Sequence, residues 1–498
     1  METVYAAFER TAQRHGAKPF LHPPGFTYEE SLEKINSTAN RYRARGYGAG
    51  HRVALLLGNE PDFLIHFLAL NSLGASIVPL NPDYRQAERD YILSHSEAGV
   101  VVTRDLLQGE FDPPAAAAPT GSGECALLYT SGTTGKPKGC LLGNFYFLEV
   151  GRRYIEDGDL CAVREGEERL ITPLPLFHMN ALAVSTTAMI LCGGCVIQLD
   201  CFHPRSWWQD VARFDATIVH YLGVMPAILL AAPEGPHDRA HRVRFGYGAN
   251  ANPKEHAAFE ARFGFPLIEG WAMTETGSGA MIVSNREPRH VGTRCVGTPR
   301  EGLQIRIVDE QERDVPQGEP GELLVRQAGA DPRRGFFSGY YKDAAATEAA
   351  WKGGWFHTGD AVRRGPDGQI HFVDRRKNII RRSGENIAAL EVEAALADHP
   401  AVRQVAVLAA PDAIRDEEVL ACVVPHQTGN KNRDTAIAIQ AWCLERLAYF
   451  KAPGYVAFVD ELPVTSTNKV QKARLADFAA NPLASKQCFD LRDGKKRR

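Results

Sequence analysis

The sequence has few cysteines, no excess of charge of one sign and no long uninterrupted hydrophobic run. Its ten cysteines among 498 residues are irregularly spaced, which excludes the disulfide framework of a small secreted domain and favours a reducing, cytoplasmic location. Lys and Arg total 57 against 60 for Asp and Glu, so charge alone selects neither a nucleic acid nor an anionic membrane as a partner. With 44% hydrophobic and 23% charged residues, the chain is typical of a globular protein, which excludes the disordered, collagen-like and coiled-coil classes.

The hydrophobic pattern does not predict a membrane anchor. The longest uncharged run, residues 180–199, is interrupted by hydroxyl residues, glycines and Gln198, so it predicts a buried helix followed by a core strand. The first residues, METVYAAFERTAQRHG, lack a hydrophobic signal segment, and we therefore do not expect secretion. We expect no stable membrane insertion and no nucleic-acid partner, while association of identical copies stays open.

The spacing of apolar runs predicts the α/β fold class for the first three quarters of the chain. Runs typical of buried parallel strands alternate with helix-length segments such as the amphipathic stretch 62–73; they lie at 53–57, 76–80, 100–102, 125–129, 195–199, 217–222 and 243–247. After about Asp374, strand and helix patterns mix in a compact α+β unit. We expect a large N-terminal domain of parallel-rich sheets covered by helices at 1–376, and a smaller C-terminal domain at 377–498.

The string YTSGTTGKPKG at 129–139 carries the strongest chemical signal. Its glycines let the backbone approach a ligand, and its hydroxyl groups and lysines supply hydrogen-bond donors and positive charge directly after an apolar run. These features predict a phosphate cradle, with a Gly/Thr-rich surface turn as the alternative. It is not the Walker pattern, because Pro137 follows Lys136 where that pattern needs Ser or Thr.

At this string the sequence resembles the adenylate-forming superfamily, which includes acyl-CoA synthetases, adenylation domains of peptide synthetases and luciferases. Further strings in the superfamily's order support the resemblance: PLFHMNA at 175–181, GWAMTETG at 270–277, GELLV at 321–325, GYYKDAAAT at 339–347, WFHTGD at 355–360, DRRKNIIRRSGENI at 374–387 and PVTSTNKVQK at 463–472. The resemblance implies an ATP-dependent carboxylic acid–CoA ligase. In such an enzyme a carboxylate attacks the α-phosphate of ATP, giving an acyl-adenylate and pyrophosphate, and the thiol of coenzyme A then takes the acyl group and releases AMP. The implied cofactors and co-substrates are ATP, Mg²⁺ and coenzyme A.

The resemblance also implies roles for individual residues. Lys469 would neutralise the carboxylate and α-phosphate, Thr274 would contact the α-phosphate, Glu275 would hold Mg²⁺, and the mobile small domain would pivot at Lys377. The nucleotide and coenzyme A would contact Thr130, Ser131, Gly132, Thr133, Thr134, Gly135, Lys136, Lys138, Trp271, Asp360, Arg375 and Gly384, with Trp271 on adenine and Asp360 on the ribose hydroxyls. Taken without its motif, each of these residues also has a purely structural interpretation. Glu275 would then lie at the start of a helix, and Asp360 would lie in a turn.

The acyl pocket is expected to include His178, Asn180, the turn 246–250 with Gly248, and Met273. His178 is counted with the catalytic residues because it would line the pocket and gate the thiol, without an acid–base role. The small domain is most similar to the carnitine/crotonobetaine ligase branch, which implies a small or medium carboxylic acid. A quaternary ammonium acid would favour an aromatic cage, for which the available residues are Phe177, Tyr221, Tyr247 and Trp271.

Two departures from the superfamily's pattern leave other functions open. Asn468 and Ala272 stand where glycine is usual. The alternatives are a stand-alone adenylating enzyme that loads a carrier protein or another nucleophile, and a nucleotide-binding protein that has lost turnover.

Several clusters outside these motifs have structural interpretations. Cys192 and Cys195, followed by Cys201 and His203, are interpreted as a buried strand start rather than a metal site. Arg376, Arg381 and Arg382 are interpreted as a solvated basic face, with coenzyme A phosphates as the alternative, and the ending KKRR is interpreted as a solvated tail.

Overall fold

The structure is a computed structural model that describes residues 2–107, 109, 111–114, 123–130, 136–223, 225–253, 255–309, 311–375, 379–426, 431–463, 470 and 472–496. Its internal contacts divide the chain into two compact units. Unit 1 comprises Met1–Pro82, Leu93–Tyr129 and Gly139–Arg376, and unit 2 comprises Asp83–Ile92, Thr130–Lys138 and Lys377–Arg498. Each unit is described by itself.

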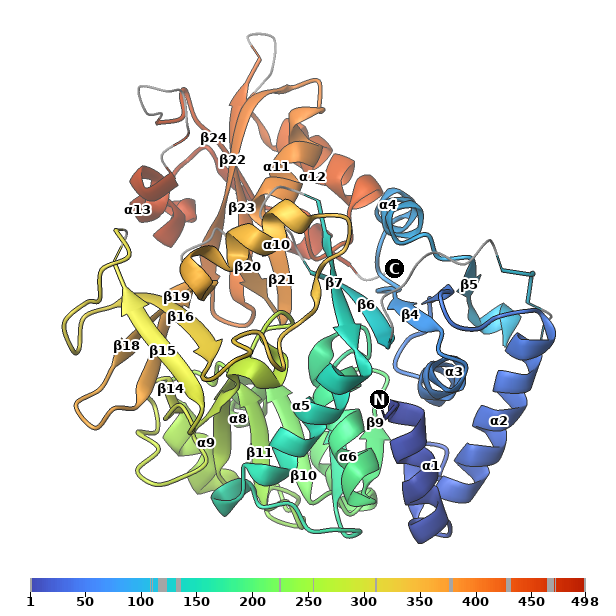
Figure 1. Cartoon of the computed structure of the whole chain (residues 1–498). Helices are drawn as coiled ribbons and strands as arrows, with labels where there is room; N and C mark the ends of the chain where they lie inside the picture. The colour runs from blue at the N-terminus through green and yellow to red at the C-terminus, as the bar shows by residue number, and fades with distance from the viewer. Residues whose placement is uncertain are drawn as a thin grey trace. The chain divides into compact units, whose positions relative to one another are not determined.

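Two parallel-rich sheets form the centre of unit 1 (Figure 1). The larger has the order β13-β12-β11-β10-β8-β9-β1-β2 and comprises β1 (Pro19–His22), β2 (Phe26–Thr27), β8 (Arg169–Thr172), β9 (Cys195–Gln198), β10 (Ile218–Leu222), β11 (Phe245–Ala249), β12 (Leu267–Trp271) and β13 (Ile282–Val283). The second has the order β17-β7-β6-β4-β3-β5 and comprises β3 (Arg52–Leu55), β4 (Ser76–Pro79), β5 (Val100–Val102), β6 (Glu124–Thr130), β7 (Lys138–Gly143) and β17 (Gly339–Tyr340). Parallel pairing joins β8, β9, β10, β11 and β12, and also β3, β4, β5 and β6. The predicted α/β fold class is confirmed.

A third sheet of unit 1 is antiparallel. Its order is β14-β19-β18-β16-β15, formed by β14 (Cys295–Gly297), β15 (Leu303–Val308), β16 (Gly321–Gln327), β18 (Phe356–Arg364) and β19 (Ile370–Arg375). The register of β18 against β19 sets Asp360 opposite Arg375. This sheet therefore carries two of the residues expected to contact the nucleotide.

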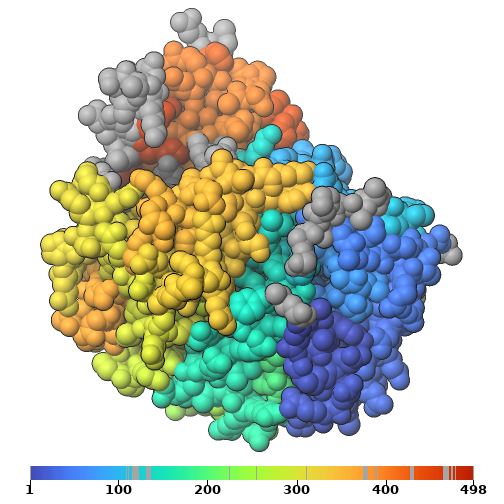
Figure 2. Space-filling view, viewed as in Figure 1, coloured from blue at the N-terminus to red at the C-terminus, as the bar shows by residue number. Residues whose placement is uncertain are grey.

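Helices cover the parallel-rich sheets of unit 1. They are α1 (Val4–His15), α2 (Tyr28–Ala44), α3 (Pro61–Ser72), α5 (Asn144–Glu156), α6 (Thr186–Cys192), α7 (Trp207–Arg213), α8 (Met225–Ala231), α9 (His256–Phe263) and α10 (Ala344–Ala350). Helix α1 packs on α2, α3, α5 and α6, and Figure 2 shows the dark-blue N-terminal segment lying against the green segment that contains α5 and α6. Helix α3 differs from the predicted amphipathic helix, because every residue from Phe63 to Asn71 is buried. Helices α1 and α2 and strand β4 all pack against it.

The predicted interpretation of residues 180–199 is confirmed. A π-helical segment, η3 (Asn180–Ser185), leads into α6 and then β9, and most of these side chains are buried. Among the helices of the described residues, none is both long and apolar enough to cross a membrane.

Unit 2 is a mixed sheet with helices on both faces. The sheet contains β20 (Ile379–Arg382), β21 (Glu385–Ala388), β22 (Val402–Asp412), β23 (Asp416–Pro425), β24 (Tyr455–Phe458) and β25 (Cys488–Asp490), and its helices are α11 (Ala389–Ala397), α12 (Arg433–Arg446) and α13 (Ala476–Ala480). Because side chains alternate along a strand, β23 feeds two cores. Val419, Ala421 and Val423 join the core with residues of α11 and α12, and Leu420, Cys422 and Val424 join the opposite core. Helix α4 (Gln86–Ser96) begins in unit 2 and ends in unit 1.

Two basic residues of unit 2 that were interpreted as solvated, Arg382 and Lys495, are buried. Arg382 does not lie on a solvated face or offer its charge to a phosphate: it is buried, and its Nε donates to Glu418 Oε2 at 2.8 Å. Lys495, the first residue of KKRR, is also buried rather than solvated, and its ammonium contacts Glu418 and the Phe450 carbonyl. A buried carboxylate is costly unless cations and hydrogen bonds surround it, so Glu418 accounts for the burial of both cations.

Candidate functional site

The segment after β12 holds the Glu275 carboxylate in a buried position within unit 1. Glu275 Oε1 accepts a hydrogen bond from the Tyr340 hydroxyl at 2.9 Å, and its backbone carbonyl accepts from the Phe337 N–H at 2.9 Å. Only 7% of Glu275 is exposed. Burial, followed by the negative charge of Glu275, raises the pKa of the Tyr340 phenol, so this hydroxyl stays protonated and donates to the carboxylate.

Neighbouring residues fix the backbone of this segment. Tyr146 on α5 donates to the Thr274 carbonyl at 2.9 Å, and the Met273 N–H donates to Thr276 Oγ1 at 2.9 Å. Gly277 has a positive φ of 46°, and a Cβ there would lie 2.2 Å from the Tyr146 ring. No other residue type fits at this turn without displacing the tyrosine.

A second buried carboxylate, Asp360, is held by Trp271. The indole Nε1–H donates to Asp360 Oδ2 at 2.9 Å, and Trp271 and Asp360 are 6% and 1% exposed. The Asp360 N–H donates to Thr358 Oγ1, whose hydroxyl in turn donates to the Leu323 carbonyl. Asp360 therefore lies in strand β18, next to the irregular positions where its pairing with β16 and β19 shifts register, rather than in the turn that is the alternative for an isolated aspartate.

The phosphate string runs from the end of one strand to the start of the next. Thr130 ends β6, and Lys138 begins β7. Within unit 2, Lys136 Nζ lies 5.4 Å from the centre of the Tyr91 ring, and the Tyr91 hydroxyl donates to the Pro137 carbonyl at 3.1 Å.

Several predicted site residues lie outside the described residues or away from these groups. Ser131, Gly132, Thr133, Thr134, Gly135, Lys377 and Lys469 lie outside the described residues. Gly384 lies in the two-residue turn between β20 and β21 of unit 2, where Ser383 and Gly384 have φ values of 51° and 86°. Two positive φ values match the tight hairpin turns that suit glycine.

Asn180 belongs to a buried polar network that the sequence analysis did not identify. Asn180 Oδ1 and Ser185 Oγ each lie 2.9 Å from His220 Nδ1, and the Tyr154 hydroxyl lies 2.9 Å from His220 Nε2. Burial lowers the pKa of His220 to about 3, so the ring is neutral. In the tautomer with its proton on Nδ1, the ring donates to the Asn180 and Ser185 oxygens, and Nε2 accepts a hydrogen bond from the Tyr154 hydroxyl. The available signal was a histidine within the apolar run TIVHYL.

The other expected pocket residues have different surroundings. Gly248 is required for strand packing, because a Cβ there would lie 2.1 Å from the Tyr221 carbonyl oxygen. Met273 is partly buried against the core, and the His178 ring meets Phe177 edge-on at 4.8 Å.

The candidate aromatic cage does not form from Tyr221 and Tyr247. The register of β10 and β11 pairs His220 with Tyr247 and Tyr221 with Gly248, so the two tyrosines point to opposite faces of the sheet. Tyr247 packs on Tyr154 and His220, whereas the Tyr221 hydroxyl donates to Glu269 at 2.7 Å.

The interpretation of Cys192 and Cys195 as the approach to a buried strand is confirmed. Both thiols are buried; Cys192 ends α6 and Cys195 begins β9, on either side of a turn that passes through Gly193 at a φ of 69°. Burial raises the pKa of each thiol to about 12.

Known proteins match this chain over nearly its whole length. Residues 8–341 match the AMP-binding enzyme family, and residues 391–469 match the C-terminal domain of AMP-binding enzymes. A crotonobetaine/carnitine–CoA ligase from Citrobacter koseri is 31% identical, over 90% of this chain and 93% of that protein. The enzyme of the same name from Proteus mirabilis is 30% identical over the same shares.

Solved structures of ligases have the same fold. An o-succinylbenzoate–CoA synthetase from Bacillus subtilis, bound to a product analogue, gives a TM-score of 0.84 at 25% identity and covers 96% of this chain and 98% of its own. A malonyl-CoA ligase with methylmalonyl-CoA and AMP gives a TM-score of 0.75 at 27% identity, covering 90% and 96%. The chain therefore belongs to the AMP-binding enzyme family, and within it to the AMP-forming acid–thiol ligases.

Proposed function

We propose that this protein joins a small or medium carboxylic acid to coenzyme A in two steps driven by ATP. The observation that carries the proposal is that Glu275 and Asp360, the carboxylates of two of the sequence motifs, are both buried in unit 1 and each is oriented by an aromatic donor. Unlike Glu418, which is buried against the cations Arg382 and Lys495, each of these two carboxylates is held by a neutral aromatic donor, which supports a role in binding a charged or polar ligand.

Glu275 is proposed to hold Mg²⁺. Mg²⁺ prefers hard oxygen ligands and commonly binds one or two carboxylates together with substrate phosphates. The Glu275 carboxylate fits this preference because it supplies hard oxygen atoms and is oriented by the hydrogen bond from the Tyr340 hydroxyl to Oε1. The ion would neutralise phosphate charge when bound.

Asp360 is proposed to accept the two ribose hydroxyl groups. Its charge is buried, and the Trp271 N–H fixes the direction of one oxygen. The string 130–138, Thr274 and Arg375 would bind the phosphates, Gly384 would bind nucleotide or coenzyme A, and the Trp271 ring would contact adenine.

In the first step a carboxylate oxygen of the acid attacks the α-phosphorus. The P–O bond to the β-phosphate breaks, and pyrophosphate leaves with the bonding electrons. Lys469 is proposed to bring positive charge to the two anions that must meet. In the second step the thiolate of coenzyme A attacks the acyl carbon, and AMP leaves as the C–O bond breaks. We propose that the chain forms two domains, 1–376 and 377–498, joined by a hinge at Lys377. Movement of the smaller domain about this hinge would allow the two steps to take place one after the other.

The Asn180 network supports an acid that carries a hydrogen-bond acceptor. Because the Asn180 carbonyl oxygen faces His220, its two N–H donors point away from that ring and are proposed to meet the acyl group. The crotonobetaine/carnitine ligases to which the chain is similar support a small acid as well. His178, Gly248 and Met273 would form other parts of the pocket wall.

A pyrophosphate-release screen tests the proposal. The full chain, ATP and Mg²⁺ are incubated with small, branched, aromatic, hydroxylated and betaine-type acids. Acid-dependent pyrophosphate, then AMP and an acyl thioester after coenzyme A is added, are expected; release of ADP and phosphate would contradict the proposal. Asn180→Leu should shift preference from hydroxylated acids toward apolar acids of the same length.

A further inference from the structure

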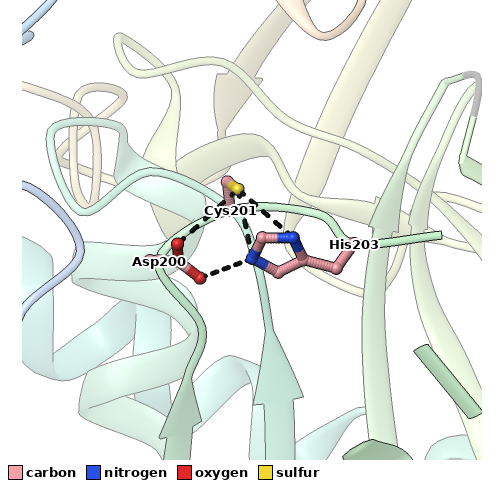
Figure 3. Close-up of side chains that lie close together, drawn as sticks. All are labelled: Asp200, Cys201 and His203. Atoms are coloured by element: carbon pink, nitrogen blue, oxygen red, sulfur yellow. Dashed lines mark hydrogen bonds and ion pairs between the residues drawn. The ribbon is translucent and has the colours of Figure 1, made fainter. Parts of the chain in front are cut away.

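Asp200, Cys201 and His203 bring an oxygen, a sulfur and a nitrogen ligand around one point of unit 1 (Figure 3). His203 Nε2 lies 2.8 Å from Asp200 Oδ1 and 3.4 Å from Cys201 Sγ, and that sulfur lies 3.8 Å from Asp200 Oδ2. No other group of three possible ligands this close together occurs within the described part of the chain. We propose that these side chains form a binding site for Zn²⁺ or a divalent metal of similar softness.

The distances suit a tetrahedral ion. Zinc bonds of about 2.0 to 2.3 Å require donor atoms roughly 3.3 to 3.6 Å apart. The Asp200–His203 separation of 2.8 Å is measured to Oδ1, and the Asp200–Cys201 separation of 3.8 Å is measured to Oδ2. A bound ion therefore requires the exposed Asp200 carboxylate and the His203 ring to rotate until one oxygen, the sulfur and Nε2 face the same point. Binding replaces the hydrogen bond between Asp200 and His203 with two bonds to the ion.

The donor set selects the class of metal. Thiolate and imidazole favour Zn²⁺ over Mg²⁺, which prefers oxygen ligands, so this site is chemically distinct from the Glu275 carboxylate. The side chains of Asp200 and His203 are 76% and 48% exposed. Three protein ligands at the surface leave the fourth position of the ion to water.

The chain is anchored before and between the three residues. Before them, the Leu199 N–H donates to the Thr172 carbonyl at 3.0 Å, and the Leu199 carbonyl accepts from Asn59 Nδ2 at 3.0 Å. Among them, the Phe202 ring packs edge-on against the buried Trp207 at 5.4 Å. Because Phe202 packs against the core, the backbone of the ligands on either side is positioned before an ion binds, which reduces the cost of ordering it.

A nucleophilic relay explains this arrangement less well. In a Cys–His–Asp relay the thiol and the carboxylate contact opposite nitrogens of the imidazole. Here the sulfur is 3.4 Å from Nε2, the nitrogen that already faces Asp200, and 3.9 Å from Nδ1. The sulfur is therefore nearer to the nitrogen that faces the carboxylate than to the opposite nitrogen that a relay requires.

Cobalt spectroscopy on the full untagged chain tests the site. After chelator treatment and removal of the chelator, Co²⁺ is added in the presence of excess Mg²⁺, and Zn²⁺ is then used to displace it. We expect one equivalent of Co²⁺ to give a thiolate-to-metal charge-transfer band and tetrahedral visible bands, which Zn²⁺ abolishes. Cys201→Ser should remove the charge-transfer band, and His203→Ala should weaken binding by about tenfold or more. Asp200→Asn should weaken binding while keeping the charge-transfer band.

Cys488→Ser is the matched control, because Cys488 is the other cysteine that is not fully buried. It should leave the spectrum unchanged, and thermal unfolding checks that each variant is folded. A missing charge-transfer band in the unmodified chain, a band that persists in Cys201→Ser, or one lost in Cys488→Ser would overturn the assignment. The readout does not depend on ligase activity, so it separates this inference from the proposed function.

Discussion

Trp271 and Asp360 are 89 residues apart in sequence and meet through one hydrogen bond. The motifs predict each residue, because each stands in its own short string. The bond between them was not predicted, since β12 and β18 belong to different sheets. At the residue scale, short strings identify candidate groups, and the packing of sheets determines which groups touch.

Trp271→Phe should raise the KM for ATP by about tenfold or more, because a hydrogen bond to a charged group contributes about 1.5 to 3 kcal/mol. The aromatic face remains, so the loss reports on the N–H group. Discrimination between ATP and 2′-deoxy-ATP should fall in parallel if Asp360 loses its orientation. Trp208→Phe, a tryptophan that stacks on Phe263, is the control, and an unchanged KM in Trp271→Phe would refute the role.

Asp157 gives a pH prediction in unit 1. Burial raises the pKa of Asp157 to about 7, so between about pH 4 and 7 the folded protein holds a proton that the unfolded chain has lost. The stabilising contribution of this group is therefore complete below about pH 4 and is lost as pH rises through about 7.

Asp157→Asn should make the free energy of unfolding less dependent on pH within that window. Urea unfolding at pH 5 and pH 8, compared with the exposed neighbour variant Glu156→Gln, measures the difference. Equal pH dependence in Asp157→Asn and the unmodified chain would rule out this titration.

At the scale of elements, a buried lysine connects distant segments of unit 2. Lys451 Nζ lies 2.7 Å from Glu88 Oε1 on α4 and 2.8 Å from Glu391 Oε1 on α11, and it lies over the Tyr84 ring at 4.6 Å. Burial opposes the charged form, yet Glu391, Tyr84 and Glu88 together raise the pKa of Lys451. The ammonium therefore stays charged inside unit 2.

Lys451→Met should destabilise unit 2 by about 3 to 5 kcal/mol, because two buried carboxylates lose their shared cation. Adding Glu88→Gln and Glu391→Gln to that variant should recover part of the loss. Chemical denaturation with the exposed-site variant Lys486→Met as reference measures both effects. A loss equal to that of the reference would show that the cluster is not stabilising.

Strands were predicted more reliably than the burial of helices. The apolar runs at 53–57, 76–80, 195–199 and 243–247 correspond to β3, β4, β9 and β11 with small changes in their ends. Helix α3 was expected to have a polar face, and its complete burial depends on α1 and α2 packing around it. Glu418 likewise gave no sequence signal that Arg382 and Lys495 would be drawn into the core.

At the scale of the whole molecule, segments far apart in the sequence share one unit. Residues 83–92 and 130–138 group with 377–498, so part of the phosphate string belongs to the same compact unit as the C-terminal segment. This grouping gives a physical basis for the proposal that the C-terminal domain takes part in the nucleotide reaction.

Lys469→Ala should lower the rate of acyl-adenylate formation by about a hundredfold or more, since a charge aimed at a transferring phosphoryl group is worth several kcal/mol. Thioester formation from preformed acyl-adenylate should change little. Rapid-quench measurement of the two half-reactions, with Lys486→Ala as the control, separates them. Equal losses in both half-reactions would contradict the role proposed for Lys469.

The sequence by itself determined the reaction class, the α/β architecture and the candidate residues, because the chemistry of phosphate and ribose requires particular groups in short, contiguous strings. Only the tertiary structure decided that Trp271 contacts Asp360, that His220 joins Asn180, that Tyr221 and Tyr247 face opposite ways, and that Cys201 and His203 meet Asp200. The physical reason is that packing, strand register and local backbone direction set distances between side chains, and these depend on the folded chain as a whole.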